Sequence, residues 1–286
     1  MGLPVCARLA AAGFDITATD VRVELRCAAE AAGARWAGSV AAAAEGGVLI
    51  TMLPGSDEVL KVMPEALGAL APGSCWLEMS TAAPRVASAI ARVAEPRGIR
   101  AIDAPVGGGP DAARSGSLLV FAGGKIDDRV RPVLDALAAR VIQTGAHGSG
   151  YATKLLVNAL WFTHAVASAE ALAVGRRLGL DLEILLEGLR ASAAGSRFLA
   201  DHADALLDGD DLTTFSLADC RRELSDVLAI ADEADVPLEV IRAVADIHTR
   251  ALERYGATDG ELLGARLVAE RAGVDLRRRS FGRGDR

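Results

Sequence analysis

The chain has 286 residues, of which 51% are hydrophobic and 24% are charged, so it is long and apolar enough to fold into two domains or one large one rather than remain disordered. Its net charge of −7 at pH 7 argues against a nucleic-acid partner, which would need a basic face. The acidic balance does not exclude small anionic substrates, because a local basic pocket can form on an acidic protein.

The first half of the chain alternates predicted helices with predicted strands. Short apolar runs that end at glycine, proline or aspartate are typical of strands. We expect helices over 3–12, 23–32 and 40–45, and strands over 15–19, 47–53, 75–79 and 100–104. This alternation predicts an α/β fold with a mostly parallel, Rossmann-like sheet and right-handed crossovers.

After about residue 150 the pattern becomes purely helical. Long Ala- and Leu-rich periodic segments cover 152–178, 181–191, 217–234, 237–254 and 259–271. We therefore expect a Rossmann-like domain over 1–147 and an all-α domain for substrate binding and oligomerisation over 148–286. The basic tail, 277–286, is expected to be a frayed terminus.

The most apolar segment, 155–178, is expected to be a buried helix rather than a membrane span. It contains Asn158, His164 and Glu170 and ends near two arginines, and a membrane span would exclude most of these. The first twenty residues lack the basic start and long apolar run of a secretory signal. We therefore expect a cytoplasmic protein with no membrane partner.

The cysteines and histidines do not indicate a metal site. The four cysteines form no C-x-x-C pair and the four histidines form no H-E-x-x-H, so no metal is expected. Scattered cysteines suit a reducing cytoplasm better than disulfides.

Asp20, at the end of the predicted strand over 15–19, favours NAD over NADP. In a Rossmann domain an acidic residue at this point accepts hydrogen bonds from the adenosine ribose, and its charge would repel a 2′-phosphate. Arg22 lies close enough in sequence to bind such a phosphate, so NADP is the less favoured alternative.

The start of the chain does not contain a complete dinucleotide-binding loop. A Rossmann domain opens with an apolar strand that runs into G-x-G-x-x-G, whereas this chain starts Met1-Gly2-Leu3-Pro4 directly before a predicted helix. Gly2 can be the last glycine of that loop. We expect an N-terminally truncated, impaired form in which the strands containing Ile16 and Leu49 are either separated or closed on each other.

Four segments together resemble the β-hydroxyacid dehydrogenase family, which includes 3-hydroxyisobutyrate dehydrogenase, and the resemblance covers nearly the whole chain. Residues 1–4 match the end of G-L-G-x-M-G-x-P. Residues 78–81 (EMST) with Pro84 resemble D-x-S-T-x-x-P, with Glu78 in place of aspartate. Residues 103–109 (DAPVGGG) resemble the substrate loop D-A-P-V-S-G-G, and residues 148–158 (GSGYATKLLVN) resemble the catalytic helix G-x-G-x-x-x-K-x-x-N-N.

The resemblance implies that Lys154 transfers the proton in the reaction. Hydride transfer to a carbonyl leaves an alkoxide that must be protonated, and alcohol oxidation needs the reverse step. Lysine can do either where burial or a nearby dipole lowers its pKa. The resemblance also implies three substrate-binding residues: Asn158, which lies one helical turn after Lys154, and Gly107 and Gly108 in the substrate loop.

The sequence departs from the family at two positions that the family uses to bind substrate. Glycine at 107 replaces a serine, and Val157 replaces the first of two asparagines, which leaves the substrate open. Arginine at 222 stands where the family carries a lysine. The implied cofactor-binding residues are Met1, Gly2, Asp20, Leu53, Pro54, Thr81 and Arg222.

The combined expectation is an NAD-dependent oxidoreductase that acts on a small 3-hydroxy acid or the matching semialdehyde. Two alternatives remain: an imine reductase, which shares the architecture but usually lacks the lysine, and a cofactor-binding or scaffold protein that has lost catalysis. The all-α half is rich enough in Ala and Leu that we expect a homo-oligomer, a dimer or a tetramer.

Overall fold

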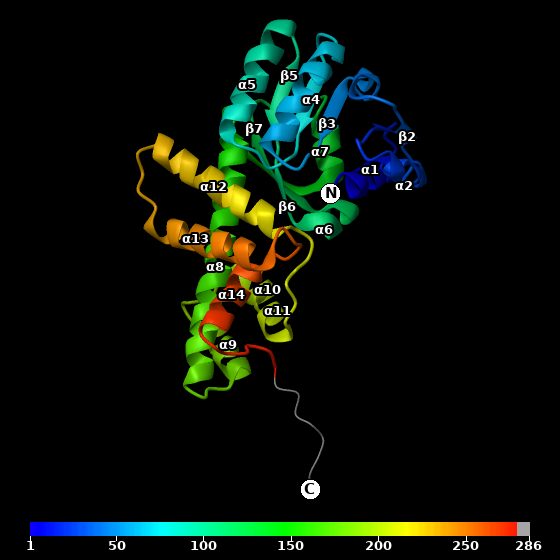
Figure 1. The fold of residues 1–286 in the computed structure, drawn as a ribbon. Coiled ribbons are helices and arrows are strands. Elements are labelled where there is room, and N and C mark those ends of the chain that lie inside the picture. The colour runs from blue at the N-terminus through cyan, green and yellow to red at the C-terminus, as the bar shows by residue number, and fades with distance from the viewer. Residues whose placement is uncertain (279–286) are drawn as a thin grey trace. The chain divides into compact units, whose positions relative to one another are not determined.

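The structure, a computed structural model, describes residues 1–278, and the chain forms two compact units that divide after Leu155. The first unit is mixed α/β and the second is helical, as the sequence predicts (Figure 1). The elements of the first unit are α1 (Gly2–Ala11), β1 (Thr17–Ala18), α2 (Arg26–Ala31), β2 (Arg35–Trp36), α3 (Val40–Ala43), β3 (Val48–Thr51), α4 (Ser56–Ala69), β4 (Cys75–Glu78), α5 (Pro84–Ala94), β5 (Arg100–Asp103), β6 (Val106–Gly107), α6 (Gly109–Ser115), β7 (Leu118–Gly123), α7 (Arg131–Leu137), β8 (Ala138–Gly145) and the start of α8 (Ser149–Arg177).

The larger sheet has six strands, with β3, β4, β5, β7 and β6 in order and β8 paired to β7. The β3–β4 and β4–β5 pairs are parallel, as expected from the βαβ alternation. The β5–β7 and β6–β7 pairs are antiparallel, so the sheet is mixed rather than parallel throughout. The predicted strands at 47–53, 75–79 and 100–104 therefore correspond to β3, β4 and β5, which pair in parallel with one another.

Both faces of this sheet are buried. Along β4 and just after it, Cys75, Leu77 and Met79 belong to one apolar cluster and Trp76 belongs to the other. This alternation follows from the two-residue period of a strand. Helices α1 and α7 contribute to the first cluster, and α4 and α5 contribute to the second, so the parallel strands must be apolar on both sides.

The strands β1 and β2 form a separate two-stranded parallel sheet. Figure 1 shows α1, α2 and β2 grouped beside the larger sheet. β1 and β3 do not pair with each other, so of the two arrangements expected for the strands near Ile16 and Leu49, separated or closed on each other, the structure has the first.

The second unit contains the rest of α8, then α9 (Leu182–Ala191), α10 (Arg197–Asp201), α11 (Ala203–Asp208), α12 (Leu217–Glu233), α13 (Glu239–Tyr255) and α14 (Leu263–Arg271). Side chains cap several of these helices: Asp181 accepts from two amides of α9, and Ser216 accepts from the Asp219 amide of α12. Trp161 and Phe198 meet edge to face, with 5.3 Å between ring centroids. The sequence analysis missed the short helices α10 and α11.

By length and composition, α8 could cross a membrane. Among the helices over residues 1–278 it alone meets that test, which a core helix of a soluble protein also passes.

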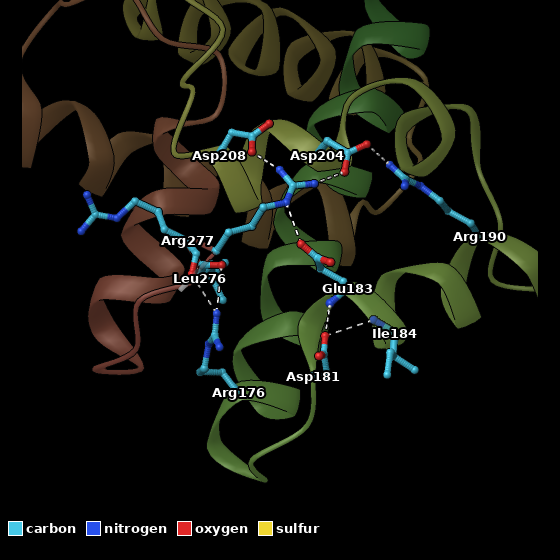
Figure 2. A network of polar contacts seen from close by, with 10 residues as sticks. Arg176, Asp181, Glu183, Ile184, Arg190, Asp204, Asp208, Leu276 and Arg277 are labelled. Atoms are coloured by element: carbon cyan, nitrogen blue, oxygen red, sulfur yellow. Dashed lines mark hydrogen bonds and ion pairs between the residues drawn. The ribbon is translucent and has the colours of Figure 1, made fainter. Parts of the chain in front are cut away.

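The C-terminal segment is attached to the second unit at least as far as Arg278, which corrects the prediction of a frayed tail from residue 277 (Figure 2). The Arg278 guanidinium bonds Glu183 at 3.0 Å and Asp204 at 2.7 Å, and also bonds Asp208. Arg176 donates to the backbone carbonyl oxygens of residues 275–277. The remainder of the predicted tail, 279–286, lies outside the described residues.

His248 should make the stability of the second unit depend on pH. Its ring is 1% exposed, its Nδ1 lies 2.9 Å from the Val244 carbonyl oxygen, and burial lowers the pKa of the imidazole. The unfolded chain therefore binds a proton near pH 6.5 that the folded chain does not. We expect the free energy of unfolding to fall below pH 6.5, by up to about 1.4 kcal/mol per pH unit.

Chemical denaturation between pH 7 and 5.5 measures this slope. His248→Leu should flatten it, whereas the exposed His164→Gln should keep it. An equal slope in the wild type and in His248→Leu would show that His248 is not its source.

Candidate functional site

Two turns at the carboxyl ends of β3 and β4 are joined by side-chain hydrogen bonds. The Leu53 amide donates to Ser80 Oγ at 2.7 Å, and the Ala83 amide donates to Ser56 Oγ at 3.0 Å. Leu53, Pro54 and Thr81, which the sequence assigns to the cofactor, all lie in these two turns. In doubly wound sheets, ligands bind outside the carboxyl ends of the parallel strands, so the turns occupy the expected position.

Asp103, the last residue of β5, attaches the start of α8 to the same end of the sheet. One carboxylate oxygen accepts from the Gly148 amide at 2.9 Å and the other accepts from the Tyr151 amide at 3.1 Å. Asp103 is 2% exposed, and burial raises the pKa of its carboxyl group while the two amides oppose that shift. An acidic group is also favourable at a helix N-terminus.

Close backbone contact at this attachment explains two glycines of the catalytic-helix motif. A Cβ at Gly150 would lie 2.4 Å from the Phe121 carbonyl oxygen and 2.6 Å from that of Asp103. Gly148 has φ +89°, a conformation that residues with a Cβ rarely adopt. The G-x-G spacing therefore follows from how closely α8 approaches the sheet.

Lys154 lies one turn after Tyr151 on α8 and is half-buried. Because Asp103 fixes the position of Tyr151, it also fixes the backbone from which Lys154 extends. The sequence analysis assigned Lys154 but gave no role to Tyr151.

Glu78, at the end of β4, is 2% exposed and has four hydrogen bonds. It accepts from Thr51 Oγ1 at 3.1 Å and from the Ser80 amide at 3.1 Å, and also from the hydroxyls of Ser80 and Tyr151. Burial raises the pKa of the Glu78 carboxyl group, and these hydrogen bonds work in the opposite direction. The sequence analysis treated Glu78 only as a substitute for aspartate in a motif.

The substrate loop contains two glycines with different constraints. A Cβ at Gly107 would make ordinary contacts of 3.9 Å with Leu119, so the backbone there accepts a Cβ. Gly108 has φ +108°, and a Cβ there would lie 2.6 Å from that of Ala112. The loop backbone thus needs glycine at 108, while glycine at 107 is not a steric requirement.

The residues assigned to the adenosine half fit a dinucleotide. Asp20 follows β1 and its side chain is 35% exposed, which leaves the carboxylate accessible to ribose hydroxyls. Its Oδ1 accepts from the Arg22 amide at 2.9 Å and from Arg22 Nε at 3.3 Å. Met1 precedes α1, and a Cβ at Gly2 in the first turn would meet no atom within 4 Å. Backbone N–H groups at such a turn suit a phosphate.

The second unit holds the other two assigned residues. Asn158 Nδ2 donates to Glu223 Oε2 at 2.6 Å, and Glu223 is buried. Arg222, the preceding residue of α12, forms an ion pair with Asp219. The bond to a carboxylate fixes which way the Asn158 amide faces.

The assigned residues of the first unit thus fall into three groups. Leu53, Pro54 and Thr81 lie in the joined turns, and Glu78 and Tyr151 connect those turns to the helix of Lys154. Met1 and Gly2 lie at the start of α1, and Asp20 follows β1. Gly107 is the last residue of β6, and Gly108 lies between β6 and α6.

Two family models match the chain. Residues 1–145 match the NAD-binding domain of 6-phosphogluconate dehydrogenase, and residues 148–268 match the NAD-binding domain of NADP-dependent 3-hydroxyisobutyrate dehydrogenase.

Several of the similar proteins are named dehydrogenases. An NAD-dependent L-serine dehydrogenase of Pseudomonas aeruginosa is 35% identical over 68% of each chain. An L-threonate dehydrogenase of Cupriavidus necator is 32% identical over 85% of this chain and 84% of its own. Among solved structures, the 3-hydroxyisobutyrate dehydrogenase of Mycobacterium tuberculosis with L-serine has a TM-score of 0.84 at 26% identity, covering 93% of this chain and 95% of its own.

Gly150→Ala should displace the start of α8, because the new methyl group would overlap backbone oxygens that cannot rotate away. We expect a loss of about 1–3 kcal/mol in the free energy of unfolding. The matched control is Gly188→Ala in α9, where no atom lies within 4 Å of the new Cβ. There alanine should stabilise the helix by up to about 1 kcal/mol. Denaturant titration compares the two, and a neutral Gly150→Ala would contradict the close contact.

Proposed function

Because the chain belongs to the β-hydroxyacid dehydrogenase family of NAD(P)-dependent oxidoreductases that act on CH–OH groups, we propose that it interconverts a small 3-hydroxy acid and the matching semialdehyde, with NAD(H) as cofactor. The observation that carries this proposal is the attachment of α8 by Asp103, which holds the helix of Lys154 at the carboxyl end of the sheet.

Lys154 is proposed as the catalytic proton donor and acceptor. The nicotinamide supplies or accepts the hydride. In the oxidative direction the neutral amine of Lys154 takes the proton of the substrate hydroxyl, and in the reductive direction its ammonium returns that proton to the oxygen.

The lysine content of the chain supports this role. Only three of the 31 basic side chains are lysines, Lys61, Lys125 and Lys154, and the other 28 are arginines. Arginine is not deprotonated in proteins, so it cannot act as a base at this position. A lysine on α8 in an arginine-rich protein therefore suits a group that must change its protonation state.

The proposed substrate is a 3-hydroxy acid, in which C1 is the carboxylate carbon and C3 carries the hydroxyl. Three of the similar proteins are named for L-serine, 3-hydroxyisobutyrate and L-threonate, which all carry a carboxylate and a 3-hydroxyl. Gly107, Gly108 and Asn158 are proposed to bind it. Backbone N–H groups in the glycine loop suit the carboxylate, and Asn158 is proposed to bind through its side-chain amide.

The residues proposed to bind the cofactor are Met1, Gly2, Asp20, Leu53, Pro54, Thr81 and Arg222.

An imine reductase is the less favoured alternative, because it does not account for Lys154. A cofactor-binding protein without catalysis is the second alternative, and an activity assay separates it from an enzyme. A cytoplasmic location, a domain boundary at residues 147–148 and self-association through the all-α half are also proposed.

Lys154→Ala should lower turnover by about 10²–10⁴, the usual contribution of a positioned acid or base, and leave NADH affinity unchanged. Lys154→Arg should be equally slow, because it keeps the charge but cannot release the proton. Steady-state assays with L-serine, 3-hydroxyisobutyrate and L-threonate measure the effect, with the exposed Lys125→Ala as control. A Lys154→Arg enzyme as fast as wild type would exclude proton transfer by this side chain.

The cofactor preference should depend on Asp20. We expect kcat/KM to favour NAD over NADP, because the carboxylate accepts from ribose hydroxyls and repels a 2′-phosphate. Asp20→Asn should reduce that ratio by removing the charge, whereas Arg22→Gln should increase it. A wild-type ratio that favours NADP would show that Arg22 outweighs the carboxylate.

A further inference from the structure

Glu78 and Tyr151 form a buried contact between β4 and α8. Tyr151 is fully buried, and its hydroxyl donates to Glu78 Oε2. The contact lies one helical turn before Lys154 and two residues before Ser80. It therefore connects the helix of the proposed proton donor to the turn that contains Thr81.

Two of the hydroxyls that bond Glu78, those of Thr51 and Ser80, also accept from groups that can only donate. The indole Nε1 of Trp76 donates to Thr51 Oγ1 at 2.7 Å, and the Leu53 amide donates to Ser80 Oγ at 2.7 Å. Because these two hydroxyls already accept from an N–H, their own protons are available to Glu78.

The bonds thus form one network with two arms. One arm runs from Glu78 through Ser80 to the Leu53 turn, and the other runs from Glu78 to Tyr151 on α8. Such buried networks hold their members rigidly when every member is satisfied. Glu78 Oε1 receives three donors and Oε2 receives the Tyr151 hydroxyl.

We propose that Glu78 is a positioning residue that couples the two cofactor turns to Lys154, with the Ser80 arm setting the turns and the Tyr151 arm setting the helix. The proposal rests on the proposed function for the roles of Lys154 and the turns. Loss of the Tyr151 arm should lower kcat, and loss of the Ser80 arm should lower NADH affinity. A purely structural network would not separate these two effects.

Three variants separate the arms. Tyr151→Phe keeps the buried ring and removes only the hydroxyl. Ser80→Ala removes the bond to the Leu53 amide, and Glu78→Gln alters both arms. The control is Thr153→Val, which removes a hydroxyl next to Lys154 that donates to the Ser149 carbonyl oxygen at 2.7 Å, its one hydrogen bond within residues 1–278.

Tyr151→Phe should lower kcat about tenfold or more, since small displacements of a reacting group are costly, with NADH affinity within about twofold of wild type. Ser80→Ala should weaken NADH binding about fivefold, the effect of losing one hydrogen bond, and largely retain kcat. Glu78→Gln should show both losses, and Thr153→Val neither. Fluorescence titration gives the NADH affinity, and kcat is measured at saturating substrate.

Hydrogen exchange tests the coupling without turnover. Tyr151→Phe and Glu78→Gln should increase deuterium uptake over residues 148–154, and Ser80→Ala and Thr153→Val should not. An inactive wild type would refute the proposed function alone, because exchange and NADH affinity still report the arms. The coupling is overturned if Tyr151→Phe retains wild-type kcat and exchange, or if Tyr151→Phe and Ser80→Ala lower kcat and NADH affinity in the same proportion.

Discussion

The start of α8 is attached to the sheet by Asp103, whose two carboxylate oxygens accept two different backbone amides in the first turn of the helix. A carboxylate buried this deeply is costly unless its oxygens are satisfied, so β5 and the helix must stay in register. Gly150 follows from the same constraint, because the helix backbone comes too close to the sheet for a side chain. The attachment determines where the next turn begins, and Lys154 lies on that turn.

The two units use charged side chains in different ways. In the first unit, Glu78 and Asp103 are buried and are satisfied by hydroxyls and amides rather than by a close cation. In the second unit, Arg278 pairs with three carboxylates at an exposed surface. Exposed pairs contribute about 0–1 kcal/mol each, whereas breaking a buried hydrogen bond to a charged group costs more. The buried contacts should therefore have the larger effect on stability.

The sequence predicts the α/β half, the helical half and the parallel strands because each is encoded by the local spacing of apolar residues along the chain. It did not predict β7, although residues 118–123 are a continuous apolar run, since such a run alone does not distinguish a strand from a buried helix. Lys154 was identified by the resemblance of its motif. Tyr151 was missed because its hydroxyl matters only through Glu78, 73 residues away in the chain. No local pattern encodes a contact of that separation.

Gly107 and Gly108 are adjacent but differ in what they permit. The first has room for a Cβ beside Leu119, while the second is confined to glycine by its backbone conformation. A single base change can convert many glycine codons to serine, so the chemistry of this loop can diversify at position 107 without repacking the domain. A side chain can therefore be added at position 107 while the backbone of the loop, which needs glycine at 108, stays as it is.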